Sequence, residues 1–144
     1  MKRLRLLLLL PLASFAKPDL LAETNNIRTT HHLTPYMASS FMNSIAESEC
    51  NYRNTHKMNT KLFMKHARPN MTVEQRYDNY FSNENFTVYY WENQAWMSTS
   101  VKYATKAFWD SLPHRKNLLD KDFKYMGQYI IGRLACESFS TFSP

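Results

Sequence analysis

The chain has 144 residues, of which 44% are hydrophobic and 15% aromatic, and it carries 18 basic and 12 acidic side chains. Three basic residues lie within the first five positions, so the rest of the chain has 15 basic side chains against 12 acidic ones and no dense basic cluster. We therefore expect no nucleic-acid partner, because such proteins gather Lys and Arg on one face. The presence of only two glycines excludes glycine-rich phosphate loops and argues against a turn-rich sheet protein.

The N-terminal stretch MKRLRLLLLLPLASFA has the layout of a secretory signal peptide. It has a basic start, an apolar stretch over residues 6–12 and the small-residue cleavage site Ser14-Phe15-Ala16. The apolar stretch is too short to cross a bilayer, which takes about 20 residues. We predict that residues 1–16 are removed and that the product is exported, periplasmic or secreted, without stable insertion in a membrane.

Residues 17–33 show little periodicity and are predicted to be a flexible lead-in to a single helical domain over residues 34–144. The first helix of this domain is expected to begin at Thr34-Pro35, with Thr as N-cap and Pro at the first helical position. Hydrophobic residues then recur at helical spacing in two adjacent stripes. These are Met37, Phe41, Ile45 and Tyr52, and Met42, Ala46 and Cys50.

Two shorter helices are predicted in the middle of the chain. The stretch 57–67 is helical in composition and ends before Pro69, since the residue before a proline resists the α conformation. Thr72 and Gln75 have the spacing of a capping box, which opens a helix that extends to about Phe81.

The segment 82–91 alternates Phe86, Val88 and Tyr90, but a lone strand would have no partner, so we interpret it as an irregular connection rich in aromatic residues. Two long helices are expected to follow. The first carries Met97, Val101, Ala104, Phe108 and Leu112 and ends at Pro113; the second begins near Asn117 and carries Leu119, Phe123, Met126, Ile130 and Leu134 beside Tyr125, Tyr129, Gly132 and Cys136. The predicted fold is therefore an all-α bundle of four to five helices with one disulfide.

Cys50 and Cys136 are the two cysteines of the chain, and an exported protein with two cysteines usually has one disulfide. Both lie on apolar stripes, so we predict a buried Cys50–Cys136 bond, with Gly132 allowing close approach of the partner backbone. In the chain-entropy model, closing a loop of this length contributes about 4 to 5 kcal/mol. Two free buried thiols are the alternative, whereas a catalytic thiol needs a positioned base, and the sequence marks none near either cysteine.

No catalytic residue, cofactor or metal ligand is predicted. The acidic pairs Glu47 with Glu49 and Asp120 with Asp122 are two positions apart, so on a helix they diverge and form solvated faces. The five histidines lack the spacing that places two metal ligands on one helix face. They are His31, His32, His56, His66 and His114.

The aromatic residues around position 90 are the candidate binding site. Tyr89, Tyr90, Trp91 and Trp96 could line a groove for a partner, since Trp and Tyr are favoured at interfaces. The alternative is a buried corner of the core.

Two triplets match the N-glycosylation sequon, Asn70-Met71-Thr72 and Asn85-Phe86-Thr87. In a eukaryotic protein they predict sugar on two surface turns, whereas in a bacterial protein they have no such meaning.

The cysteine placement and helix order resemble those of small exported bacterial and phage-encoded helical proteins of unknown function, which pair a cysteine in the first helix with one in the last. This resemblance implies no catalytic residues. The features that carry it are Cys50, the stretch KMNTKLFMK with Met58, Ala104 with Phe108, Pro113, and YIIGRLACES with Cys136.

A second comparison is with the secreted cysteine-rich CAP proteins. Asn83-Glu84-Asn85 and Gly127-Gln128-Tyr129 are similar to the G-E-N and G-H-Y motifs of those proteins, but the Gly of the first and the His of the second are replaced. On that ground we do not assign the chain to the CAP family.

These features favour an exported binding protein without enzymatic activity, such as a periplasmic inhibitor or immunity-type protein with an unidentified protein partner. The alternative is a secreted hydrolase whose catalytic acidic and histidine residues are dispersed along the sequence.

Overall fold

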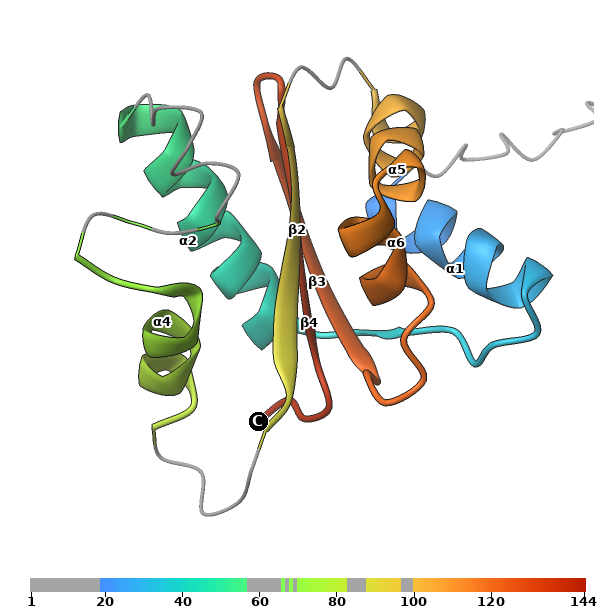
Figure 1. Ribbon diagram of the computed structural model, residues 1–144, viewed down its shortest axis with the longest axis horizontal. Coiled ribbons are helices and arrows are strands. Elements are labelled where there is room, and N and C mark those ends of the chain that lie inside the picture. Colours follow the sequence, from blue (N-terminus) through green and yellow to red (C-terminus); the bar gives the residue numbers. More distant parts are fainter. Residues whose placement is uncertain (1–18, 57–65, 67, 69, 83–87, 97–99) are drawn as a thin grey trace, which may run out of the picture.

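A computed structural model describes residues 19–56, 66, 68, 70–82, 88–96 and 100–144. The predicted signal peptide and most of the helix predicted over residues 57–67 lie outside the described residues. The elements are α1 (Leu20–Thr30), β1 (Met37–Ala38), α2 (Ser40–His56), α4 (Val73–Tyr80), β2 (Tyr90–Trp96), α5 (Val101–Asp110), α6 (Leu112–Leu118), β3 (Tyr125–Ile131) and β4 (Leu134–Ser140). They form three layers, with a sheet between two layers of helices (Figure 1).

The sheet has four strands in the order β1-β3-β4-β2. The short strand β1 runs parallel to β3, whereas β3 and β2 both run antiparallel to β4. Helices α2 and α4 cover one face, and α1, α5 and α6 cover the other (Figure 1). The hydrophobic core is divided accordingly. One cluster, on the side of α1, α5 and α6, contains Phe108 and Phe139, and another, on the side of α2 and α4, contains Met42 and Tyr77.

The prediction of an all-α bundle is wrong, and its largest error lies at the C-terminus. The residues predicted as the last helix form the β3–β4 hairpin, in which Ile131 pairs with Leu134 across the turn Gly132-Arg133. Every residue of β4 is buried, so this strand shows no alternation of polar and apolar side chains. Periodicity alone cannot distinguish such a strand from a buried helix.

A second error follows from the first. Strand β2 begins at Tyr90, inside the segment 82–91 that was interpreted as an irregular aromatic connection, and it pairs with β4 from Tyr90 opposite Ser140 to Trp96 opposite Leu134. The partner of β2 is β4, which lies in the stretch predicted to be a helix. With that stretch taken as helical, no partner for a strand near residue 90 was left in the sequence.

The glycine that permits a close approach is Gly127 rather than Gly132. A Cβ atom at Gly127 in β3 would overlap the backbone of Met42 and Asn43 in α2, so the helix rests directly on the strand. Gly132 has open space around it and a φ of +57°, which suits the hairpin turn.

A disulfide between Cys50 and Cys136 joins α2 to the sheet, with the two Cα atoms 5.9 Å apart. Both side chains are buried. Cys136 lies in strand β4, not in a helix, so the bond links two layers of the molecule instead of two helices of a bundle.

The predicted capping box of α4 is confirmed. The Gln75 N–H donates to Thr72 Oγ1 at 3.3 Å, and the Thr72 N–H donates to Gln75 Oε1 at 2.9 Å.

Other helix boundaries differ from the predictions. Residues 20–30, assigned to the lead-in, form α1, and α2 begins at Ser40 instead of Thr34-Pro35. The helix predicted to end at Pro113 ends at Asp110 as α5, and α6 begins at Leu112. Pro113 lies in the first turn of α6, where its missing N–H leaves no intrahelical bond unmade.

Candidate functional site

Two adjacent residues of β2, Glu92 and Asn93, point to opposite faces of the sheet because side chains alternate along a strand. Strand β2 is at the edge of the sheet, where the two helical layers can approach each other. Glu92 contacts Arg76 of α4, whereas Asn93 contacts His114 and Asn117 of α6. Both are buried, and each belongs to a polar cluster.

Glu92 is surrounded by donors. Its Oε1 accepts hydrogen bonds from Arg76 Nη2 at 2.8 Å and from Gln94 Nε2 at 2.9 Å. His66 Nδ1 lies 3.1 Å from the same oxygen, and the Tyr77 hydroxyl donates to Oε2 at 3.4 Å. Burial alone would raise the pKa of Glu92, but the hydrogen bond with His66 and the charge of Arg76 outweigh it and lower this pKa. Glu92 is therefore a carboxylate at neutral pH.

Glu49 of α2 shares the same cations. Its Oε1 lies 2.8 Å from Arg68 Nη2 and 3.1 Å from Arg76 Nε. Burial and the neighbouring charge of Glu92 raise the pKa of Glu49. Arg53 Nη2 lies 3.9 Å from Glu92 Oε1. The cluster thus balances two carboxyl groups with three guanidinium groups, and we call it the Glu92 cluster.

A contact between two histidines joins the helical layers around the edge of the sheet. His66, which precedes α4, has a side chain that is 15% exposed, and its Nε2 lies 3.4 Å from Nε2 of His114 in α6. Burial and the proximity of His66 lower the pKa of His114 to about 4. His114 is therefore a neutral imidazole at neutral pH.

Two histidines and a carboxylate are residue types that bind Zn²⁺, but their arrangement here does not suit a metal. Glu92 Oε1 already faces Arg76, and the guanidinium at 2.8 Å would repel a cation on that oxygen. Among the residues that the structure describes, no group of three or more His, Cys, Asp or Glu side chains is placed to hold a metal ion.

The second polar cluster lies on the other face and has Glu137 of β4 at its centre. The Thr24 hydroxyl donates to Glu137 Oε1 at 3.0 Å, and Asn93 Nδ2 donates to Oε2 at 2.9 Å. Asn117 Nδ2 in turn donates to Asn93 Oδ1 at 2.8 Å. Burial raises the pKa of Glu137 to about 8, although both hydrogen bonds act to lower it. Glu137 is therefore mostly protonated at neutral pH, and this Glu137 cluster ties α1 and α6 to the sheet.

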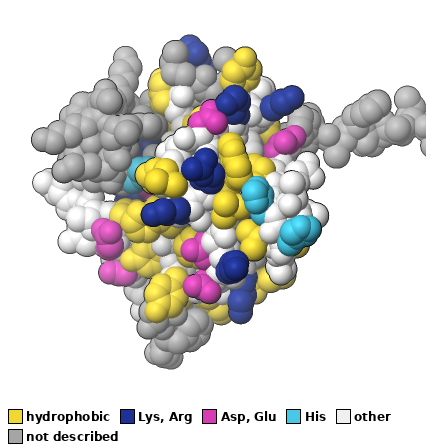
Figure 2. All heavy atoms as spheres, turned by 45° about the vertical axis from the view of Figure 1, so that its right-hand side comes forward, with side chains coloured by type: hydrophobic (Ala, Val, Ile, Leu, Met, Phe, Trp, Pro, Cys, Tyr) yellow, Lys and Arg dark blue, Asp and Glu magenta, His cyan; other side chains and the backbone are white. Residues whose placement is uncertain are grey.

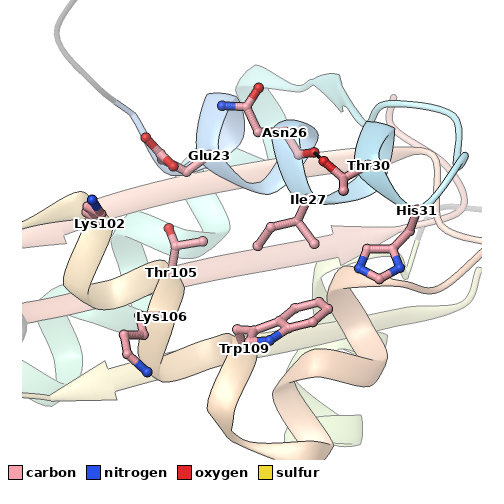
Figure 3. A pocket seen from close by; sticks show the side chains of 9 residues that line it. All are labelled: Glu23, Asn26, Ile27, Thr30, His31, Lys102, Thr105, Lys106 and Trp109. Atoms are coloured by element: carbon pink, nitrogen blue, oxygen red, sulfur yellow. Dashed lines mark hydrogen bonds between the residues drawn. The ribbon is translucent and has the colours of Figure 1, made fainter.

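A groove of about 430 Å³ lies between α1 and α5 (Figure 3). Ile27 of α1 points into it from one side, and Trp109 of α5 lines the other. Lys102 and Lys106 lie on successive turns of α5 along the same groove. The remaining lining residues are Glu23, Asn26, Thr30, His31 and Thr105. The volume falls within the range of about 300 to 1,000 Å³ that is typical of small-molecule sites.

Trp109 is held in place by its neighbours. The His31 ring centroid lies 5.2 Å from that of Trp109, and the Arg115 guanidinium lies 5.4 Å from the Trp109 ring centroid. The face that contains the groove shows hydrophobic side chains next to basic ones (Figure 2). This wall of the groove is therefore apolar, and its indole ring contacts a side chain from α6 and one that follows α1.

The four aromatic residues predicted to bind a partner lie in or beside β2. Tyr89, Trp91 and Trp96 are 65%, 39% and 47% exposed. Tyr90 instead stacks on Tyr77 with ring centroids 4.5 Å apart. Tyr89 and Trp91 share one face of the strand, whereas Tyr90 and Trp96 face the other side. The structure does not bring the four together into one surface, and their binding role stays a prediction.

Sequence reasoning missed the Glu92 cluster. The pair Glu47 and Glu49 is predicted to form a solvated helix face, but Glu49 is only 1% exposed. One signal was available, because the dipeptide Glu-Asn occurs twice. The comparison with G-E-N used Glu84-Asn85, which lies outside the described residues, whereas Glu92-Asn93, with Trp91 in place of Gly, lies at the buried site.

The family model of the cysteine-rich secretory protein family, CAP, matches residues 21–132. This segment contains α1 except Leu20, strands β1, β2 and β3, and all members of the Glu92 cluster. The chain belongs to the CAP family. No curated protein sequence matches it.

Solved structures of three bacterial proteins share the fold. A cysteine-rich secretory protein from Staphylococcus aureus has a TM-score of 0.68 at 17% identity over 85% of this chain and 37% of that chain. An extracellular protein containing an SCP domain from Bacillus anthracis gives 0.69 at 19% identity over 83% and 38%. An outer surface protein from Borrelia burgdorferi gives 0.65 at 14% identity over 84% and 88%. The chain thus spans less than two fifths of the length of the first two proteins.

The comparisons correct two conclusions from the sequence. The resemblance to small helical two-cysteine proteins is wrong, because the chain has the αβ fold of CAP proteins. The decision against the CAP family is wrong as well, since it rested on two replaced motif residues. The descriptions of the family and of two solved structures name secreted or extracellular proteins, which agrees with the predicted export. None of the helices in the described ranges is long and apolar enough to cross a bilayer.

Proposed function

We propose that the chain is an exported, non-enzymatic CAP-domain protein that binds a small molecule in the groove between α1 and α5. The observation that carries this proposal is the combination of an apolar wall and basic side chains in one hollow of about 430 Å³. Largely preformed, mostly apolar hollows with a few placed polar groups are the usual form of ligand sites.

The lining favours a ligand with an apolar body and an acidic group. Ile27 and Trp109 offer apolar surface, and burying such surface contributes about 25 cal/mol per Å². Lys102 and Lys106 lie on the exposed side of α5, and Lys106 Nζ forms a surface ion pair with Asp110 for which an acidic ligand group would compete. Glu23 is the only carboxylate among the residues described as lining the groove.

Two fluorescent dyes of similar shape test this proposal: anilinonaphthalene sulfonate, which is acidic, and aminoanthracene, which is not. The parent protein should bind the sulfonate dye more tightly. Asn26→Trp, which fills the groove from an exposed position of α1, should abolish binding of both dyes. Lys102→Glu with Lys106→Glu should raise the Kd of the sulfonate dye about tenfold, which corresponds to about 1.4 kcal/mol of binding free energy.

Lys116→Glu is the matched control, since Lys116 is an exposed lysine of α6 that does not line the groove. It should leave both affinities unchanged. A parent protein that binds neither dye, or equal effects of the control and the α5 variants, would contradict the proposal.

A secreted hydrolase is the second candidate, and one observation favours it. His66, Glu92 and His114 come from three distant segments, yet His66 lies between the other two, with Nδ1 3.1 Å from Glu92 Oε1 and Nε2 3.4 Å from His114 Nε2. If the second candidate holds, ester or peptide hydrolysis by the purified protein should fall to background in His66→Ala and persist in Lys116→Glu. The absence of hydrolysis by the parent across both substrate classes would eliminate this candidate.

A protein partner, of the inhibitor or immunity type, is a separate proposal supported by the exposed side chains of Tyr89 and Trp91. Chemical cross-linking in the secreted fraction of the source cells should yield an adduct between the protein and its partner. The adduct should be absent with the double variant Tyr89→Ala, Trp91→Ala. The same adduct in parent and variant would place the contact elsewhere.

A further inference from the structure

One sequence motif has no part in the proposed function. The sequon Asn70-Met71-Thr72 lies just before α4, and Asn70 is exposed. Asn70 has a φ of +62°, a left-handed conformation that asparagine tolerates better than most residues. The backbone of this turn is closed by the pair Arg68 and Met71, whose N–H and C=O groups bond to each other. The turn thus presents Asn70 at the surface.

The folded structure uses the sequon threonine without using the asparagine. The Thr72 hydroxyl accepts the Gln75 N–H as the N-cap of α4. Within the described part of the chain, the Asn70 side chain makes no hydrogen bond that a modification would break. A group attached to Asn70 Nδ2 would therefore leave the cap and the turn intact.

The surface beside Asn70 is shaped and polar enough to carry a sugar. A hollow of about 360 Å³ is lined by Asn70, Met71, Gln75, Asp78 and Asn79. Amide and carboxylate groups of this kind donate to and accept from hydroxyl groups. Three of the residues that line the hollow belong to α4, which lies on the opposite side of the sheet from α1 and α5 (Figure 1), so a saccharide in the hollow would not obstruct the groove.

The order of synthesis also favours modification. In a chain that enters a secretory compartment through its N-terminal signal, Asn70 appears long before Cys136. The acceptor turn is therefore accessible before the Cys50–Cys136 bond can close the fold.

We propose that Asn70 is the acceptor of an N-linked oligosaccharide. The bond forms between Asn70 Nδ2 and the anomeric carbon of the first sugar of a lipid-linked oligosaccharide diphosphate. The lipid diphosphate leaves with the bonding electrons, and the amide nitrogen loses one proton.

The first experiment uses the protein purified from the medium of its own source. Treatment with a peptide amidase that releases N-glycans converts a modified Asn to Asp, and heavy-oxygen water labels the product. Peptide mass spectrometry should find the labelled Asp at position 70. An unmodified Asn70 in the native protein would overturn the proposal.

Variants secreted from a eukaryotic host separate the sequon from the helix cap. All carry Asn85→Gln, which removes the other sequon. The glycan should be present in the parent, in Thr72→Ser and in the control Asn79→Gln, and it should be absent from Asn70→Gln and Thr72→Asp. Thr72→Asp keeps an N-cap residue and loses the sequon, so its folding can be checked independently. A glycan-free parent, or a glycan that persists at residue 70 in Thr72→Asp, would refute the assignment.

Discussion

Glu92 and Glu137 are buried carboxyl groups on neighbouring strands of one sheet, yet they differ in charge state. Glu92 is 1% exposed and Glu137 is 0% exposed, so burial acts almost equally on both. Glu92 meets Arg76, and its pKa is lowered; Glu137 meets a hydroxyl and an amide, and its pKa is raised to about 8. The comparison shows that the neighbours, not the depth of burial, decide whether a buried carboxyl group is charged.

The two clusters therefore stabilise the fold in different ways. The Glu92 cluster depends on charge balance, so removing one member leaves another charge buried without a partner. The Glu137 cluster depends on hydrogen bonds to a protonated carboxyl group. Because that group loses its proton as pH rises, the contribution of the cluster to stability depends on pH. Four measurements can break or sharpen this contrast.

The largest effect is expected from Arg76→Met, which removes the cation shared by Glu49 and Glu92. The free energy of unfolding, measured with urea at neutral pH, should fall by about 3 to 5 kcal/mol, the cost of an uncompensated buried charge. Adding Glu49→Gln and Glu92→Gln should restore part of the loss. A loss below about 1 kcal/mol would show that Arg53 and Arg68 are enough to balance the charges of Glu49 and Glu92.

Glu137→Gln should change the pH dependence of stability. The pKa of Glu137 is about 8 in the folded state and near 4.5 when exposed, so between these values the folded state binds more protons than the unfolded state. Stability of the parent should therefore fall as pH rises through this window, by at most about 1.4 kcal/mol per pH unit. The variant should lack this decline. Parallel curves for parent and variant would mean that Glu137 is ionised in the folded protein.

His114→Gln should act in the opposite pH direction. The pKa of His114 is lowered from 6.5 to about 4, so between these values the unfolded state binds more protons than the folded state. Stability of the parent should therefore rise with pH through this window, and the total change should be smaller than for Glu137 because the pKa of His114 is shifted less. Melting temperatures measured across this window should show the rise in the parent and not in the variant. A rise that survives in the variant must come from another group.

The smallest effect is expected from Thr24→Val, which keeps the shape of the side chain and removes the hydroxyl that donates to Glu137. Loss of one buried hydrogen bond should cost about 1 kcal/mol at neutral pH. Thr29→Val is the matched control, since Thr29 is an exposed threonine of the same helix. Urea unfolding gives the free energy of unfolding of both variants. Equal losses of stability would show that the hydrogen bond from Thr24 to Glu137 has no special role.

Local features of the sequence were predictable, and features that depend on distant pairing were not. The capping box of α4 needs only Thr72 and Gln75, so it could be read directly. Strand β4 is buried on both faces between β3 and β2, so its residues look like one side of a buried helix. Gly132 in a two-residue turn after the β-prone stretch YII was the local sign of a hairpin.

The Glu92 cluster could not be predicted from spacing. Its members extend from Glu49 in α2 to Glu92 in β2, and only the folded chain brings them together. Motif rules recognise ligands or acids at short, fixed intervals along one helix. The members of this cluster come from several separate segments, so no such interval joins them all.

The Cys50–Cys136 bond has a mechanical consequence. It closes a covalent ring that contains α4, β2, α5, α6 and β3, with 86 positions between its ends, and leaves α1 outside. If the ends of the chain are pulled apart, tension passes through the sulfur atoms, and roughly 300 Å of contour length inside the ring carries no load. A protease that cuts one peptide bond within the ring likewise leaves both pieces attached. The bond thus keeps the molecule in one piece after such a cut as well as stabilising the intact fold.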